Sequence, residues 1–173
     1  IDLKDALGLI ALRGRLMADL PGGVMISVRA SEAEVLPFLG AGLDLAAVNG
    51  AKAVVLAGSE EAAAAIIPGL EAAGFVTSRL HTSHAFHSYM MDAAVAPFRE
   101  AVAKLTLRAP RTPIVSTVTG DWLTEAEATD PDYWANHIRR PVRFYDAVQV
   151  LWAEGRHMFL ETGPGRTMSV LAG

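Results

Sequence analysis

The sequence of 173 residues lacks cysteine, long apolar runs and a signal-peptide pattern. Without thiols it can build no disulfide framework, no thiolate nucleophile and no thiolate metal site. No apolar run approaches the roughly 20 residues that a membrane-spanning helix needs. No basic start precedes an apolar core, as it would in a secretory signal. The sequence therefore predicts a cytoplasmic protein that does not contact a membrane.

The sequence also lacks an excess of positive charge and a recognisable nucleophile motif. The net charge is −4 and no basic patch is interleaved with aromatic residues, which argues against a nucleic-acid partner. A Gly-x-Ser-x-Gly turn, the usual setting of a nucleophilic serine, does not occur. Apolar residues make up 51% of the chain, which is ample for a packed core. The length suits one domain or a large part of a bigger one.

The first half of the chain predicts a small antiparallel sheet. A helix over residues 2–20 leads into the order strand, helix, strand, strand, helix, strand, the split βαβ arrangement of ferredoxin-like domains. Asn49-Gly50 predicts the hairpin turn between the second and third strands. The predicted elements are strand 23–29, a short helix opened by the capping box 31–34, strands 43–48 and 53–58, helix 60–73 and strand 75–80.

The second half predicts alternating helices and strands, as in an α/β layer. It is too short for a complete doubly wound sheet, so we expect further sequence before residue 1. The predicted elements are helix 89–105, strand 114–118, helix 133–138, a helix from Pro141 to about residue 155, strand 157–161 and a last helix after the turn 163–165.

Three of the five histidines lie within seven residues, at His81, His84 and His87. Histidine titrates nearest neutral pH and is the usual proton carrier in catalysis. A catalytic base is therefore one interpretation of this cluster, and a loop histidine with a structural hydrogen bond is another. Because the three residues are evenly spaced, a zinc site is a third alternative.

Four separated motifs, at residues 12–17, 83–88, 133–144 and 161–165, occur together in this chain. In order and spacing they resemble the acyltransferase domain of type I polyketide synthases, a relative of malonyl-CoA:acyl carrier protein transacylases. The resemblance covers essentially the whole chain. It places the family's Gly-His-Ser-x-Gly segment, with the nucleophilic serine, before residue 1, so we expect a C-terminal portion of the domain.

The resemblance implies an α/β fold: an incomplete α/β-hydrolase-like large subdomain with an inserted ferredoxin-like (split βαβ) small subdomain. Residues 1–22 would be a helix of the large subdomain and 23–80 the small subdomain. Residues 81–173 would supply the active-site loop and the C-terminal part of the large subdomain.

The resemblance also assigns roles to five residues. His87 would be the catalytic base and Arg13 the partner of the malonyl carboxylate, since a guanidinium matches a carboxylate with two parallel hydrogen bonds. His84 and Phe86 would line the substrate pocket, with Phe86 narrowing it against methylmalonyl groups. His137 would orient the imidazole of His87.

Each assignment except that of His87, already weighed above, has a plainer alternative. Arg13 could be a solvated or snorkelling side chain, and His84 a second base or a polar surface residue. Phe86 could be a core aromatic that anchors its loop. His137 could be a histidine that the helix dipole favours at a helix C-terminus.

The activity that the resemblance implies is transfer of a malonyl group from malonyl-CoA to the phosphopantetheine thiol of an acyl carrier protein, through an acyl-serine. No bound cofactor or metal is expected, and the coenzyme A thioester is a substrate. Expected partners are the carrier protein, neighbouring synthase domains and the missing part of the same domain. The alternative is a non-catalytic module that docks a carrier protein or synthase domains.

Overall fold

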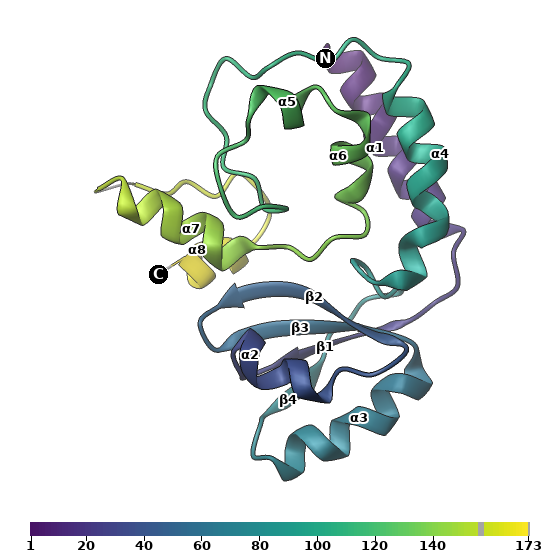
Figure 1. The fold of residues 1–173 in the computed structure, drawn as a ribbon, viewed down its shortest axis with the longest axis vertical. Coiled ribbons are helices and arrows are strands. Elements are labelled where there is room, and N and C mark those ends of the chain that lie inside the picture. Colours follow the sequence, from purple (N-terminus) through teal and green to yellow (C-terminus); the bar gives the residue numbers. More distant parts are fainter. Residues whose placement is uncertain (156–157, 173) are drawn as a thin grey trace.

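The computed structural model describes residues 1–155 and 158–172. Figure 1 shows two parts, a small sheet with its helices and a group of helices on the other side of it. The first helix, α1 (Leu3–Ala18), belongs to the helical group and begins where predicted. The side chain of Asp2 accepts a 2.8 Å hydrogen bond from the Asp5 amide and caps it.

The sheet has four antiparallel strands in the order β2-β3-β1-β4. The predicted order of strands and helices therefore occurs between residues 24 and 79. The strands are β1 (Val24–Val28), β2 (Leu43–Gly50), β3 (Ala53–Gly58) and β4 (Thr77–Arg79).

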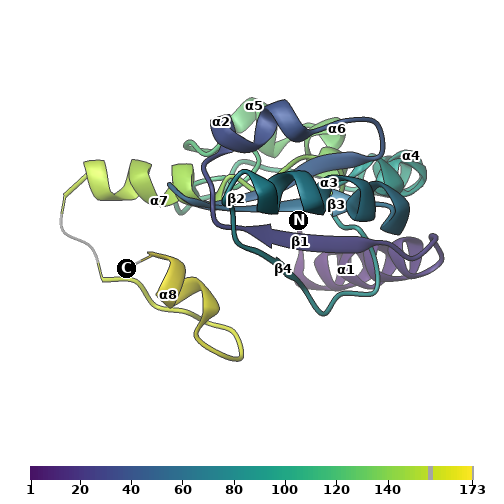
Figure 2. The same cartoon turned by 90° about the horizontal axis from the view of Figure 1, so that it is seen from below.

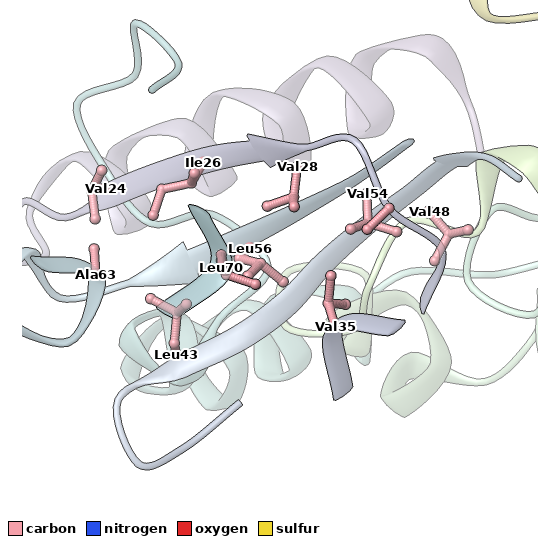
Figure 3. Packing of buried hydrophobic residues seen from close by; sticks show 11 residues of the cluster. Val24, Ile26, Val28, Val35, Leu43, Val48, Val54, Leu56, Ala63 and Leu70 are labelled. Atoms are coloured by element: carbon pink, nitrogen blue, oxygen red, sulfur yellow. The ribbon is translucent and has the colours of Figure 1, made fainter. Parts of the chain in front are cut away.

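Two helices cover one face of this sheet (Figures 1 and 2). The predicted capping box opens α2 (Glu32–Val35), which runs into a 3₁₀ turn, η1 (Leu36–Phe38). The second helix, α3 (Glu60–Ala72), continues through Pro68. Side chains two residues apart on a strand share a face, so Val24, Ile26 and Val28 of β1 all point into the core beneath these helices (Figure 3).

The other face of the sheet packs against the histidine loop. Met25 of β1 and Val55 of β3 belong to a second apolar cluster, which includes the buried Ala85 of that loop and Val142. The sheet thus has a closed core on one face and the loop that carries His87 on the other.

In the helical part α1 packs against α4, with Met17 and the fully buried Met91 in their shared core. Its remaining helices begin with the 3₁₀ turn η2 (Tyr89–Met91) and α4 (Asp92–Val102), followed by α5 (Glu125–Ala128), α6 (Pro131–Asn136), α7 (Phe144–Ala153) and α8 (Thr167–Ala172). Among the described residues, no helix combines the length and the apolar character needed to cross a bilayer.

Two predicted strands in the second half are wrong where the structure describes them. Residues 114–118 form only an isolated bridge, Val115 to Trp122. A strand requires a neighbour along its length, and here separate contacts satisfy the backbone, such as the 2.6 Å bond from the Arg143 amide to the Thr117 carbonyl. Residues 158–161 form no strand, and His157 of that prediction lies outside the described residues.

Two predicted boundaries are wrong as well. The hairpin turn lies at Ala51-Lys52, because Gly50 stays in β2 opposite Ala53 after a register shift. The helix expected from Pro141 begins only at Phe144. The intervening Val142 is extended and pairs in parallel with Ala47 of β2, so the edge of the sheet holds this segment out of the helix.

Candidate active site

His87 lies in the loop between β4 and η2, and its backbone is in the left-handed region with φ of 59°. The fully buried Ser88 closes this turn: its hydroxyl donates to the Ala85 carbonyl at 2.6 Å and accepts from the Met90 amide at 3.2 Å. A non-glycine residue in the left-handed region costs energy, and such strain concentrates at functional sites. The fold therefore maintains the position of His87 at a cost.

The His87 ring is oriented by a backbone carbonyl. Its Nδ1 donates to the carbonyl oxygen of Arg140 at 2.8 Å, which leaves Nε2 free to accept a proton. Burial lowers the pKa of His87, the Arg140 carbonyl opposes this, and the positive charge of Arg13 lowers the pKa further. The net shift is downward, so the imidazole is neutral and able to act as a base near neutral pH.

Arg13 projects from α1 and is half-buried. Among the residues that the structure describes, none forms an ion pair or a hydrogen bond with its guanidinium. A partly buried cation without a partner is unfavourable until an anion pairs with it. The charge of Arg13 lowers the pKa of both His87 and His137, so an anion bound by Arg13 would oppose this effect on both imidazoles.

His137 follows α6, and its ring is enclosed by aromatic side chains. It stacks on Trp134, with ring centroids 5.2 Å apart, and meets the edge of Tyr133 at 5.1 Å. Its Nε2 is buried without a hydrogen-bond partner. Burial, followed by the charges of Arg13 and His87, lowers the pKa of His137 to about 4. Burial and nearby positive charge thus outweigh the helix dipole that would favour protonation.

A cavity of about 320 Å³ connects Arg13 and His137. Apolar side chains, among them Phe98, dominate its lining. The lining residues are Ile1, Leu9, Arg13, Phe98, Val102, Leu107, Arg108, Ala128, Trp134 and His137. A guanidinium and a neutral imidazole therefore share one largely apolar cavity, and His87 acts electrostatically on the second of them.

The residue expected to orient His87 needs correction. The carbonyl that contacts its ring belongs to Arg140, three residues beyond His137. The His137 ring is instead packed against Trp134 at the end of α6. The chain makes one further turn after His137, and only then does a carbonyl, that of Arg140, contact the His87 ring. A backbone carbonyl leaves no signature in the sequence. The one usable signal was Pro141, because the residue before a proline is driven to an extended conformation.

His84 and Phe86 hold the loop in place. The Nε2 of His84 donates to the Leu20 carbonyl at 3.0 Å, and its Nδ1 accepts from the Ser83 hydroxyl at 2.7 Å. Phe86 packs in both clusters that flank the loop, 5.8 Å from the His84 ring. Neither residue lines the cavity of Arg13 and His137. Both therefore have a structural role, and the expected role in the substrate pocket stays a prediction.

The zinc alternative finds no support in the described part of the chain. No three histidine, aspartate or glutamate residues gather there in an arrangement that could hold a metal ion. His81 is exposed, while His84 and His87 already direct ring nitrogens at protein partners. The three histidines therefore do not form a shared metal site in the described part of the chain.

Comparison with known proteins identifies the family. The family model described as the acyl transferase domain matches residues 1–170. The spectinabilin polyketide synthase system protein NorB of Streptomyces orinoci is 42% identical over 98% of the chain, and the chain spans 8% of that protein. Mycoketide-CoA synthase of Mycobacterium tuberculosis is 42% identical over 95% of the chain, which spans 4% of it.

Solved structures agree with this. The acyltransferase domain from the second module of the salinomycin polyketide synthase is 45% identical, with a TM-score of 0.94 over 99% of this chain and 41% of that one. The acyl transferase domain of SpnD, in complex with 2-(pent-4-yn-1-yl)malonyl, is 41% identical with a TM-score of 0.92, over 99% and 42% of the two chains. The chain thus spans about two fifths of these solved domains.

Proposed function

The chain belongs to the acyl transferase domain family, and from this premise we propose that it takes part in transfer of a malonyl group from malonyl-CoA to the phosphopantetheine thiol of an acyl carrier protein, in polyketide biosynthesis. The observation that carries the proposal is the unpaired guanidinium of Arg13, whose charge acts on two neutral imidazoles. An anion receptor next to a proton acceptor suits an acyl group that ends in a carboxylate.

His87 is the proposed base. A serine hydroxyl is a weak nucleophile until a neighbouring base removes its proton. The free Nε2 of His87 would take that proton, and later the proton of the carrier thiol that attacks the acyl-serine. The serine is proposed to come from sequence outside these 173 residues, because no Gly-x-Ser-x-Gly turn is present. Coenzyme A is the substrate carrier, and no bound cofactor or metal is proposed.

Arg13 is the proposed receptor of the malonyl carboxylate. It lies in a largely apolar cavity, where a charge-assisted pair is stronger than in water. Phe86 and His84 are proposed to shape the acyl pocket through the loop that they hold. A single steric contact of this kind discriminates by about 1–3 kcal/mol, so selection of malonyl over methylmalonyl would be partial.

The fold proposal follows the same family. Residues 23–80 would be a ferredoxin-like small subdomain inserted in an α/β-hydrolase-like large subdomain, to which residues 1–22 and 81–173 contribute. The proposed partners are the remaining part of that domain, an acyl carrier protein and neighbouring synthase domains, in the cytoplasm.

The test is the pair Arg13→Ala and Arg15→Ala in the complete domain. Arg15 lies on the same helix, is exposed and serves as the matched control. Loss of a charged hydrogen bond of about 1.5–3 kcal/mol should lower malonyl transfer roughly tenfold to a hundredfold in Arg13→Ala. Transfer of acetyl, which has no carboxylate, should change far less.

The readout is the acyl-enzyme mass and the rate of transfer from malonyl-CoA and acetyl-CoA. Equal losses for both acyl groups would remove the carboxylate role of Arg13. A complete domain that forms no acyl-enzyme at all would favour the alternative, a docking module.

A further inference from the structure

A network of three charged side chains connects the two segments that form the His87–Arg140 hydrogen bond. Arg139 immediately precedes Arg140. Its Nε donates to Asp92 at 2.7 Å, and its Nη2 lies 3.2 Å from Oδ2 of Asp44. Asp92 begins α4 and Asp44 belongs to β2. One side chain therefore connects the carbonyl segment to the sheet and to the helical part.

The histidine loop is fastened to the same carboxylate. Oδ2 of Asp44 also accepts a 2.6 Å hydrogen bond from the amide of Tyr89, two residues beyond His87. Asp44 thus contacts the chain just after the imidazole and, through Arg139, the chain just before the carbonyl. Arg139 and Asp44 are both about 31% exposed, so water screens this pair less than it screens the fully exposed ion pairs.

The backbone around Arg140 is fixed at both ends. Its amide donates to the Asn136 carbonyl at 2.8 Å, at the end of α6. Two residues later the amide of Val142 donates to Ala46 at 2.9 Å, which adds this segment to the edge of β2. The carbonyl of Arg140 lies between these two points, and the side chain of the preceding Arg139 adds contacts to Asp92 and Asp44.

We propose that Arg139, paired with Asp44 and Asp92, is a positioning residue that keeps the Arg140 carbonyl in line with Nδ1 of His87. Arg139 itself touches neither the imidazole nor the cavity of Arg13 and His137. Its effect on acyl transfer is therefore indirect, and that part of the inference rests on the proposed function. Catalytic groups misplaced by about 1 Å lose up to about a hundredfold in rate.

The groups that face His87 set the expected sign of a pH effect. They are the carbonyl of Arg140, Arg13 of α1 and His137 at the end of α6. The carbonyl contact raises the pKa of His87, whereas burial and Arg13 lower it. A displaced carbonyl removes the contact that raises the pKa, so the pKa of His87 should fall further.

The experiment compares Arg139→Gln, Arg139→Lys and the control Arg79→Gln in the complete domain. Arg79 forms an exposed ion pair with Glu60 on the far side of the sheet and has no link to residues 139–143. We expect roughly tenfold lower kcat in Arg139→Gln with KM nearly unchanged. The acid limb of its pH–rate profile should move to lower pH. Arg139→Lys keeps the charge and should recover part of the loss.

The independent readout is the NMR titration of the His87 ring, including its Nδ1 proton, which requires no activity. We expect a lower pKa and a weakened Nδ1 hydrogen bond in Arg139→Gln and a wild-type titration in Arg79→Gln. Asp92→Asn removes only the more exposed partner of Arg139. It should lower the pKa of His87 and weaken the Nδ1 hydrogen bond by smaller amounts, and it replaces Arg139→Gln as the test if that variant does not fold.

An unchanged His87 titration in both Arg139→Gln and Asp92→Asn overturns the inference, whatever the activity. A wild-type domain that transfers no malonyl group overturns the proposed function instead, and the NMR titration then still decides the role of Arg139.

Discussion

At the scale of single residues, the backbone of His87 shows how this chain combines strain with chemistry. The left-handed conformation costs an ordinary residue roughly 1–2 kcal/mol, and only glycine adopts it freely. The loop tolerates this cost because Ser88 and the Arg140 carbonyl hold both sides of the residue. The proposed role of His87 as a base and the stability of the loop therefore make opposite demands on this position.

The stability of variants at residue 87 should show this conflict. We expect His87→Gly to be more stable than His87→Ala by about 1 kcal/mol, because alanine keeps the steric penalty and glycine relieves it. Both variants should lose acyl transfer. Urea denaturation of the two proteins measures the difference, and equal midpoints would show that the loop relaxes around residue 87.

Acid stability should depend on His137. Its pKa is about 4 in the folded protein against 6.5 for an unperturbed histidine. Below pH 6.5 the unfolded chain therefore takes up a proton that the folded protein resists, so the stability present above pH 6.5 is lost as the pH falls towards 4. We expect the free energy of unfolding to fall more steeply over this range in the wild type than in His137→Gln. Parallel pH profiles would contradict this prediction.

The sequence indicated candidate side chains for the site, whose roles stay predictions, but not the backbone contact that orients His87. The charge of Arg13 lowers the pKa of His87 and of His137, and the charge of His87 lowers the pKa of His137. The Arg140 carbonyl could not be predicted because every residue carries one, and only the fold decides which one meets an imidazole. The contact of His84 with the Leu20 carbonyl was missed for the same reason.

At the scale of elements, the hairpin β2–β3 depends on glycine at one end and not at the other. A Cβ on Gly58 would overlap the carbonyl oxygen of Gly42, the residue just before β2. A Cβ on Gly50 would meet only the side chain of Ala53, at 3.4 Å. Backbone that cannot move aside makes the first substitution costly.

We therefore expect Gly58→Ala to destabilise the protein by about 1–3 kcal/mol or more. Gly50→Ala, the matched control in the same hairpin, should change stability by less than about 1 kcal/mol. Thermal and urea denaturation of both variants provide the comparison. Similar losses in the two would mean that strand propensity, and not the contact with Gly42, sets the cost.

The sequence predicted elements well where local signals agree. Capping residues and alternating apolar side chains placed α2, α3 and the first three strands within about two residues. The sequence-based prediction was wrong where pairing with another strand decides whether a segment is extended. Residues 114–118 have strand-like composition but no neighbouring strand in the described chain, and Val142 is extended only because the edge of β2 is free to accept it.

At the scale of the whole molecule, residues 139–143 join the sheet to the helical part. Besides the Arg139 contacts, Arg143 binds Glu32 of α2 at 2.8 Å and Asp146 of α7 at 2.5 Å. Val142 accepts from the Val48 amide at 2.8 Å between these two anchors. The two parts are thus connected through the isolated bridge at Val142 as well as through the chain at residues 19–23 and 80–88.

Val142→Pro should loosen this junction without unfolding the sheet. Proline removes the donor to Ala46, a loss of about 1 kcal/mol, at a position where the backbone is already extended. Hydrogen exchange should accelerate at the Val48 amide and stay slow at Leu56 in the centre of the sheet. Val142→Ala keeps the amide and should leave exchange at Val48 slow, and fast exchange in both variants would assign the junction to side-chain packing.

The bridge that Val142 forms with the edge of β2 has a consequence for domain exchange between related synthases. A chimera that swaps only residues 23–80 would bring a foreign β2 edge against the host's 141–143 segment, with new side chains opposite Arg139 and Arg143. The contacts between the transplanted sheet and residues 139–143 would then be mismatched close to the His87 imidazole. A graft that carries residues 139–143 together with the sheet keeps the native contacts between β2 and this segment.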